Sequence, residues 1–178
     1  GEPDVETQAV MLAHGLHTEF NEESKKEAQQ AAAYFEETGD LDREDHTDTF
    51  IFTIDPPDAK DFDDAINISF DSKTKEWELG VHIADVACFV QTGSALDLGA
   101  IERGNSVYLP RHVIPMLPEV LSNGVCSLQE GVRRWAKSVF IRFDNKGRVL
   151  GHRLRNTVIC SAKRLTYLEA QALIDGNE

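Results

Sequence analysis

Five aspartates crowd one ten-residue stretch of this sequence, and their type and spacing are suited to binding a metal ion. The stretch reads TIDPPDAKDFDDA over residues 53–65 and contains Asp55, Asp58, Asp61, Asp63 and Asp64, with a single lysine among them. Two carboxylates about 4 Å apart repel each other by roughly 4 kcal/mol at an effective dielectric constant near 20. One lysine cannot offset that repulsion, but a divalent cation can. Short oxygen ligands favour Mg²⁺, with Mn²⁺ as the alternative.

The spacing of these aspartates fits one or two metal ions. If the end of the stretch is extended, Asp61 and Asp63 share one side of the chain and Asp64 faces the other. The Pro-Pro turn can bring Asp55 back toward them. Two metals about 3.5–4 Å apart would clamp the attacking and leaving oxygens of a phosphoryl displacement. The competing interpretation is a solvated acidic loop. A helix–loop–helix calcium site is weaker, because its glycine at the sixth position is missing.

The elements that must position this stretch are predicted from periodicity and from turn residues. The patterns predict helices over 4–20, 22–37, 95–104 and 165–174, and strands over 49–54, 65–70, 77–84, 136–143 and 148–159. Residues 39–48 read as an exposed acidic connector, and 106–132 as irregular. The predicted fold is α+β, with a mostly antiparallel mixed sheet, flanking helices and an N-terminal helical segment. We expect a helical lead-in over 1–47 and a second domain over 48–178.

Composition bounds the function classes. The chain has 178 residues, a net charge of −13 and 41% hydrophobic residues, which excludes a wholly disordered protein. No apolar run is long enough for a membrane span, and no secretory signal is visible. Three widely spaced cysteines predict reduced thiols and a cytoplasmic location. Residues 1–64 hold 19 acids and 4 bases, whereas residues 101–164 hold 4 acids and 12 bases. This uneven charge leaves a nucleic-acid partner open.

Four blocks follow one another along the chain: TIDPPDAKDFDDA, VHIADVACFV, GSALDLGAIERGNSVYLP and VIPMLPEVLSNGVCSL. In order and spacing they resemble the catalytic domain of the ribonuclease II/ribonuclease R (RNB) family, from about residue 48 onward. The resemblance implies a metal-dependent 3′→5′ exoribonuclease that hydrolyses single-stranded RNA to 5′-mononucleotides. It also implies that the chain carries the first half of the catalytic domain. We therefore expect the isolated piece to be inactive or nearly so, and its exposed apolar surface to favour self-association.

The resemblance also assigns roles to individual residues. The family's four active-site aspartates fall on Asp55, Asp61, Asp63 and Asp64, which together form the expected metal site. Asp55 and Asp64 are the first choice as direct Mg²⁺ ligands and Asp61 supports them, while Asp63 is the carboxylate most needed for chemistry. The family's aromatic residue that stacks on the 3′-terminal base falls on Tyr108.

The basic part of the chain is expected to supply phosphate contacts to RNA. Arg111, directly after the SVYLP block, is the residue named for this role, and about a third of the other basic residues between 133 and 155 would join it. The competing interpretation is that most of these are ordinary exposed faces of hairpin strands. His82 is expected to be a structural histidine with its hydrogen bonds satisfied inside the protein. His14 and His17, three positions apart, could together bind a metal ion, but this is a weak possibility because no third ligand is evident.

Two other functions stay open at this point. The parent protein could be a catalytically silent RNA-binding or regulatory module with the RNB fold. A weaker interpretation is an acidic interaction domain with no RNA role.

Overall fold

The computed structural model describes residues 5–39, 42–109 and 112–176, which form two compact units. The first unit combines Gly1–Glu37 with Val86–Gly124, and the second combines Thr38–Asp85 with Val125–Glu178. The predicted boundary after residue 47 stays a prediction. The five aspartates all lie in the second unit.

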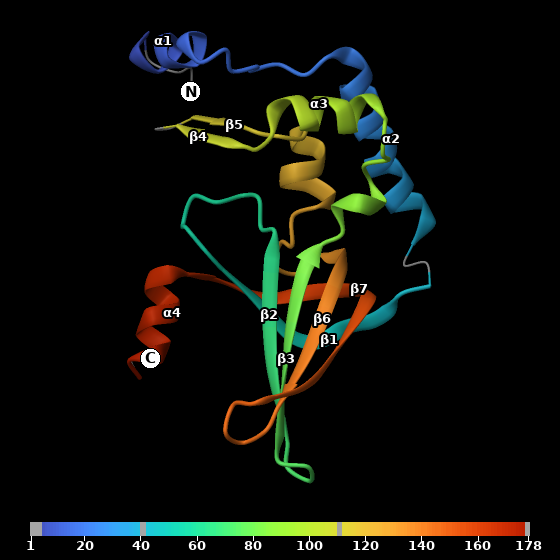
Figure 1. Ribbon diagram of the computed structural model, residues 1–178, viewed down its shortest axis with the longest axis vertical. Helices are drawn as coiled ribbons and strands as arrows, with labels where there is room; N and C mark the ends of the chain where they lie inside the picture. Colours follow the sequence, from blue (N-terminus) through green and yellow to red (C-terminus); the bar gives the residue numbers. More distant parts are fainter. Residues whose placement is uncertain (1–4, 40–41, 110–111, 177–178) are drawn as a thin grey trace. The chain divides into compact units, whose positions relative to one another are not determined.

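The second unit is a closed five-stranded sheet followed by a helix (Figure 1). Its elements are β1 (Glu44–Asp55), β2 (Asp64–Asp71), β3 (Glu76–Ala84), β6 (Arg133–Phe143), β7 (Val149–Thr166) and α4 (Tyr167–Ile174). Neighbouring strands are antiparallel, except that β1 and β7 run parallel and close the sheet. The predicted α+β class with a mostly antiparallel mixed sheet is therefore confirmed.

Alternating apolar side chains and two tight turns produce this sheet. Trp135, Ala136 and Phe140 of β6 are buried, as are Val158 and Ile159 of β7. Successive residues of a strand face opposite sides, so this part of the sheet is covered on both faces. Gly147, with a φ of 76°, forms the turn between β6 and β7, because a side chain would be strained there.

A buried ion pair ties the start of the sheet to the end of β3. The Arg43 and Asp85 side chains are 3% and 0% exposed, and Nη2 of Arg43 lies 2.7 Å from Oδ2 of Asp85. Nη1 of Arg43 also donates to the carbonyl oxygens of Ala136 and Thr157, and its guanidinium stacks over Trp135 at 4.7 Å. Through Arg43, which directly precedes β1, these contacts connect β6 and β7 to Asp85, the residue that follows β3.

The first unit is mainly helical. It contains α1 (Val5–Ala13), α2 (Glu22–Thr38), the short 3₁₀ turn η1 (Val86–Cys88), α3 (Ala95–Arg103), the hairpin β4 (Val107–Leu109) and β5 (His112–Ile114), and the π-helical turn η2 (Leu121–Val125). Ser94 caps α3 by accepting from the Asp97 amide, and Glu27 of α2 accepts from the first amides of α3. Ser24 of α2 donates to the Ala95 carbonyl, so α2 and α3 are joined directly. Among the described residues, no helix has the length and apolar character needed to cross a membrane.

Several predicted boundaries were wrong. The first helix ends at Ala13, before Gly15 with its φ of 60°. The connector predicted over 39–48 is partly strand, because β1 begins at Glu44 and pairs there with β7. β7 continues to Thr166, where the same parallel pairing holds it extended. Residues 106–132 are not wholly irregular, since they contain β4, β5 and η2.

Candidate functional site

The four aspartates expected to bind metal lie at the junction of β1 and β2. Asp55 is the last residue of β1 and Asp64 the first of β2, while Asp61 and Asp63 lie in the intervening loop. We call residues 56–63 the acidic loop. β1 and β2 are antiparallel neighbours, so the end of one strand and the start of the next lie side by side. β2 begins at Asp64, so Asp61 and Asp63 precede the paired part of the strand, and the predicted sides of their side chains stay a prediction.

Backbone contacts anchor the C-terminal end of the acidic loop. The Phe62 side chain is buried at 7% exposure. Its amide donates to Oγ of Ser127 at 3.1 Å, and its carbonyl accepts from the Leu128 amide at 2.8 Å. The Asp63 carbonyl accepts from the Ala84 amide at 2.9 Å. The loop is therefore hydrogen-bonded to β3 and to the segment that precedes β6.

Arg164 of β7 holds the proline end of the loop. Its Nη2 donates to the carbonyl oxygens of Pro56 at 2.9 Å and Pro57 at 2.6 Å, and its guanidinium lies 5.0 Å from the centre of the Phe62 ring. Sequence reasoning missed both Arg164 and Ser127. Each is more than 60 positions from the loop residues that it contacts, and no spacing pattern connects them.

Burial and mutual repulsion raise the pKa of two of the carboxylates. Burial raises the pKa of Asp55, and the charges of Asp64 and Asp61 raise it further, while Thr53 and Arg164 act in the opposite direction. Asp63 lies at the surface, but the surrounding protein partly desolvates it, and this desolvation is the largest cause of its raised pKa. The charges of Asp61, Asp64 and Asp55 add to the rise. The structure thus brings the four expected carboxylates within electrostatic reach of one another.

The donor chemistry of this junction fits a divalent cation. Oδ2 of Asp55 is buried and has no hydrogen-bond partner among the described residues, which is costly for a carboxylate oxygen. A cation would satisfy this oxygen and relieve the repulsion. Within the described ranges, however, no three His, Cys, Asp or Glu side chains already form a metal-binding group. Mg²⁺ commonly takes only one or two protein carboxylates and completes its coordination with water and substrate phosphate.

The structure describes two of the three other aspartate and RNA-contact candidates, Tyr108 and Asp58. Tyr108 lies in β4 of the first unit, and its side chain is 63% exposed. Arg111 falls outside the described residues. Asp58 is exposed in the acidic loop and is not among the charges that raise the pKa of Asp55 or Asp63.

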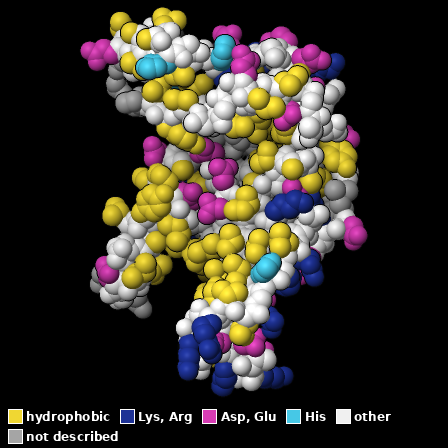
Figure 2. Space-filling model, in the orientation of Figure 1, with side chains coloured by type: hydrophobic (Ala, Val, Ile, Leu, Met, Phe, Trp, Pro, Cys, Tyr) yellow, Lys and Arg dark blue, Asp and Glu magenta, His cyan; other side chains and the backbone are white. Residues whose placement is uncertain are grey.

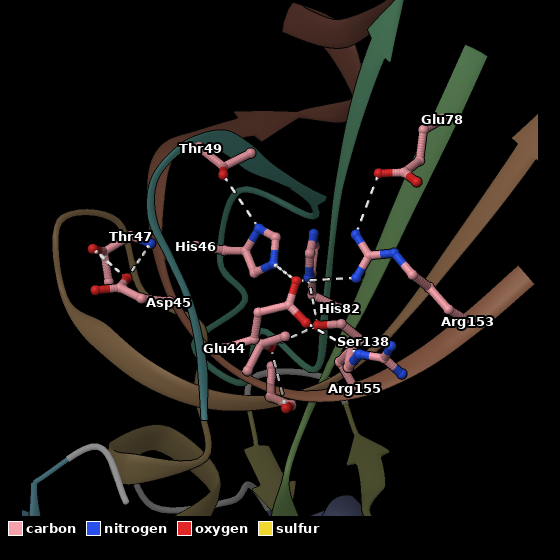
Figure 3. Close-up of polar contacts among 12 residues, drawn as sticks. Glu44, Asp45, His46, Thr47, Thr49, Glu78, His82, Ser138, Arg153 and Arg155 are labelled. Carbon is pink, nitrogen blue, oxygen red and sulfur yellow. Dashed lines mark hydrogen bonds and ion pairs between the residues drawn. The ribbon is translucent and has the colours of Figure 1, made fainter. Parts of the chain in front are cut away.

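Most basic residues of the second unit are engaged within the unit itself. Figure 2 shows Lys and Arg side chains gathered at the tips of its hairpins, where Arg142 pairs with Glu76 and Arg148 with Asp144. Arg134 is buried and donates to the Ser127 carbonyl. Further along β7, the side chains of Arg153 and Arg155 point toward Glu44 (Figure 3). These pairings favour a structural role for the basic residues that they involve.

His82 shows the contacts of a structural residue, whereas His17 forms an exposed ion pair. His82 is fully buried, with Nδ1 2.7 Å from Oγ of Ser138 and Nε2 2.9 Å from Oδ1 of Asn67. Burial, with a smaller effect from His46, lowers the pKa of His82 to about 4, so the ring is neutral at pH 7. His17 lies 3.3 Å from Glu102. His14 and His17 gain no third ligand within the described part of the chain.

Comparison with known proteins gives a consistent result. Residues 43–178 match the RNB domain. Ribonuclease R of Thermotoga maritima is 45% identical over 168 residues, which cover 93% of this chain and 24% of that protein. Mycoplasma genitalium RNase R, solved with ribose-methylated single-stranded RNA, superposes with a TM-score of 0.87 at 34% identity, over 96% of this chain and 26% of that one. The same protein has been solved with double-stranded RNA.

The fold is also found in a protein described as a pseudonuclease, yeast Ssd1. It superposes with a TM-score of 0.67 at 22% identity, over 76% of this chain and 17% of that one, which shows the fold alone. The chain spans about a quarter of the length of the relatives it matches. The domain match covers most of the described second unit, including the whole acidic loop. The chain belongs to the RNB domain family.

Proposed function

We propose that this chain is part of a metal-dependent 3′→5′ exoribonuclease that hydrolyses single-stranded RNA to 5′-mononucleotides. The observation that carries the proposal is that four aspartates lie at, or directly between, the end of β1 and the start of β2 in an RNB domain. The names of the ribonuclease R relatives, and the RNA bound to the Mycoplasma protein, support RNA as the substrate.

In this proposal the residues of the junction divide the work. Asp55, at the end of β1, and Asp64, at the start of β2, hold Mg²⁺ or Mn²⁺, and Asp61 supports them. When bound, the cation would neutralise the carboxylates and stabilise the charge that develops on a phosphate. Two of the four carboxylates, Asp61 and Asp63, lie within the loop, and of these Asp63 is the exposed one. Asp63 is therefore placed to meet a substrate from solvent.

The substrate contacts proposed outside the junction involve Tyr108 and Arg111. The exposed ring of Tyr108 offers a stacking surface that suits any base, because every base has a π-face. Arg111 would contact phosphate. The inactivity of the 178-residue chain alone, its self-association and the cytoplasmic location of the parent protein also stay predictions.

RNA degradation by the full-length parent tests the proposal. Asp63→Asn should abolish mononucleotide release while leaving the far-ultraviolet circular dichroism spectrum unchanged. Asp58→Asn is the matched control, because it removes an exposed aspartate from the same loop and should keep activity. Unchanged degradation by Asp63→Asn would contradict the proposed site.

A catalytically silent RNA-binding module is the remaining candidate, and the pseudonuclease with this fold shows that the fold does not guarantee catalysis. Such a module would bind RNA with salt-dependent affinity and release no mononucleotides in either variant. An acidic interaction domain would bind no RNA.

A further inference from the structure

We propose that Ser127 is a positioning residue that sets the backbone of the acidic loop around Asp61 before any metal binds. This inference deepens the proposed function and depends on it for its catalytic meaning. The hydrogen bonds themselves belong to the metal-free protein and can be tested without activity.

The Ser127 hydroxyl connects the two residues that flank Asp61. Ser127 is 0% exposed. Its Oγ donates to the Lys60 carbonyl at 2.7 Å and accepts from the Phe62 amide at 3.1 Å. A hydroxyl has one proton to donate and two lone pairs to accept, so one side chain can make both bonds. The backbone on either side of Asp61 is therefore fixed by a single buried atom.

The surroundings of Ser127 make it a firm anchor. The next residue, Leu128, donates its amide to the Phe62 carbonyl at 2.8 Å, so Phe62 is bonded at both its backbone groups. The Ser127 carbonyl accepts from Nε of Arg134 at 2.9 Å, and Arg134 belongs to β6. This chain of contacts connects the loop to the sheet through Ser127.

Holding the loop in this way matters because its carboxylates repel one another. Asp61 and Asp63 lie in the short loop between Asp55, the last residue of β1, and Asp64, the first residue of β2, so like charges are held near one another. Without a fixed backbone, repulsion would move Asp61 and Asp63 away from Asp55. Ser127 opposes that movement with two hydrogen bonds to groups 65 and 67 positions away. The protein itself therefore sets the backbone path of the loop around Asp61 before an ion binds.

The test compares Ser127→Ala with Ser138→Ala in the metal-free chain. Ser138 is a matched control, because it is also buried and also makes two hydrogen bonds, to His82 at 2.7 Å and to Oγ1 of Thr157 at 2.6 Å. Hydrogen exchange read by NMR reports the Phe62 amide directly. Its exchange should accelerate at least about tenfold in Ser127→Ala and stay as in the wild type in Ser138→Ala. Equal protection of this amide in all three proteins would overturn the inference.

Calorimetric titration with Mn²⁺ gives the second measurement. Residues that orient metal ligands typically change metal affinity by about 10–100-fold when mutated, so Ser127→Ala should raise the Mn²⁺ dissociation constant about tenfold. Ser138→Ala should leave it unchanged, although both variants lose some stability. Equal affinities in the two variants would also contradict a positioning role.

Two further proteins keep the outcomes distinguishable. If the wild type binds no Mn²⁺, or binds it equally well after Asp55→Asn, the proposed metal site fails, while the exchange of the Phe62 amide still decides the role of Ser127. If Ser127→Ala does not fold, Ser127→Cys replaces it in both measurements, because it fills the same space with a much weaker hydrogen-bonding group. Wild-type exchange and affinity in Ser127→Cys would then count against the inference.

Discussion

Replacing Asp63 with asparagine should stabilise the metal-free protein. The pKa of Asp63 is raised by partial desolvation and by the charges of Asp61, Asp64 and Asp55, so ionising it costs more in the folded state than in the unfolded state. Asparagine has nearly the same shape and no charge. The substitution removes this cost while leaving the backbone hydrogen bond of residue 63 to Ala84 in place.

The gain in stability expected for Asp63→Asn is small, because Asp63 lies at the surface and its charged neighbours are close in sequence. Interactions between exposed charges are typically worth about 0.2–1 kcal/mol each, and three carboxylates act on Asp63. Asp61 and Asp64 are also its neighbours in sequence, so part of their repulsion persists in the unfolded chain. We therefore expect a gain of about 1 kcal/mol, which corresponds to about 2–4 °C in Tm for a chain of this length.

The pH dependence has a definite sign. A carboxylate whose pKa is raised on folding makes the folded state bind more protons than the unfolded state, so its contribution to stability falls as pH rises above about 3.8. The gain in the free energy of unfolding from Asp63→Asn should therefore be largest near pH 7. It should vanish below about pH 3.8, where Asp63 is protonated in both the folded and the unfolded state.

Thermal unfolding in EDTA and low salt, followed by circular dichroism across pH, measures this difference. Asp58→Asn is the control, and as a surface change it should shift stability by less than about 0.5 kcal/mol. The reasoning would be refuted if Asp63→Asn were less stable than the wild type at pH 7, or if Asp58→Asn gave the same gain.

Two further predictions concern the scaffold of the second unit. Asp85→Ala should lower the free energy of unfolding, measured with urea, by about 3–5 kcal/mol, because it leaves the Arg43 guanidinium buried without its carboxylate. The double variant Arg43→Met, Asp85→Leu should recover most of this loss. A loss below about 1 kcal/mol in Asp85→Ala would contradict the importance of the ion pair. His82, with a pKa lowered to about 4, should make the protein less stable as pH falls from 6.5 to 4, since only the unfolded state binds the proton readily. His82→Gln should flatten that part of the stability profile measured by thermal unfolding, and an unchanged slope would count against a buried neutral imidazole.

Local sequence signals predicted the parts of the fold that depend on neighbouring residues. The hairpins between β2 and β3 and between β6 and β7 followed from alternation and turn residues. The Ser94 cap and the Gly104 end of α3 were also predicted, because capping chemistry is local. The parallel pairing of β1 with β7, which closes the sheet, joins residues more than 100 positions apart and has no local signal.

The candidate site divides in the same way. Aspartates in an unusual density identified the acidic loop, because charge repulsion can be read from the sequence. The residues that hold the loop could not be found, since Ser127 and Arg164 are common residue types in distant segments. Tyr108 was named through the family resemblance, and its role as a stacking residue stays a prediction.

The most direct test of the central claim is the degradation of 5′-labelled single-stranded RNA by the full-length protein that contains this chain. In Mg²⁺ the label should move progressively into shorter RNA while 5′-mononucleotides appear, and EDTA should stop both. Degradation that continues in EDTA, or internal cleavage without mononucleotides, would contradict a metal-dependent 3′→5′ exoribonuclease.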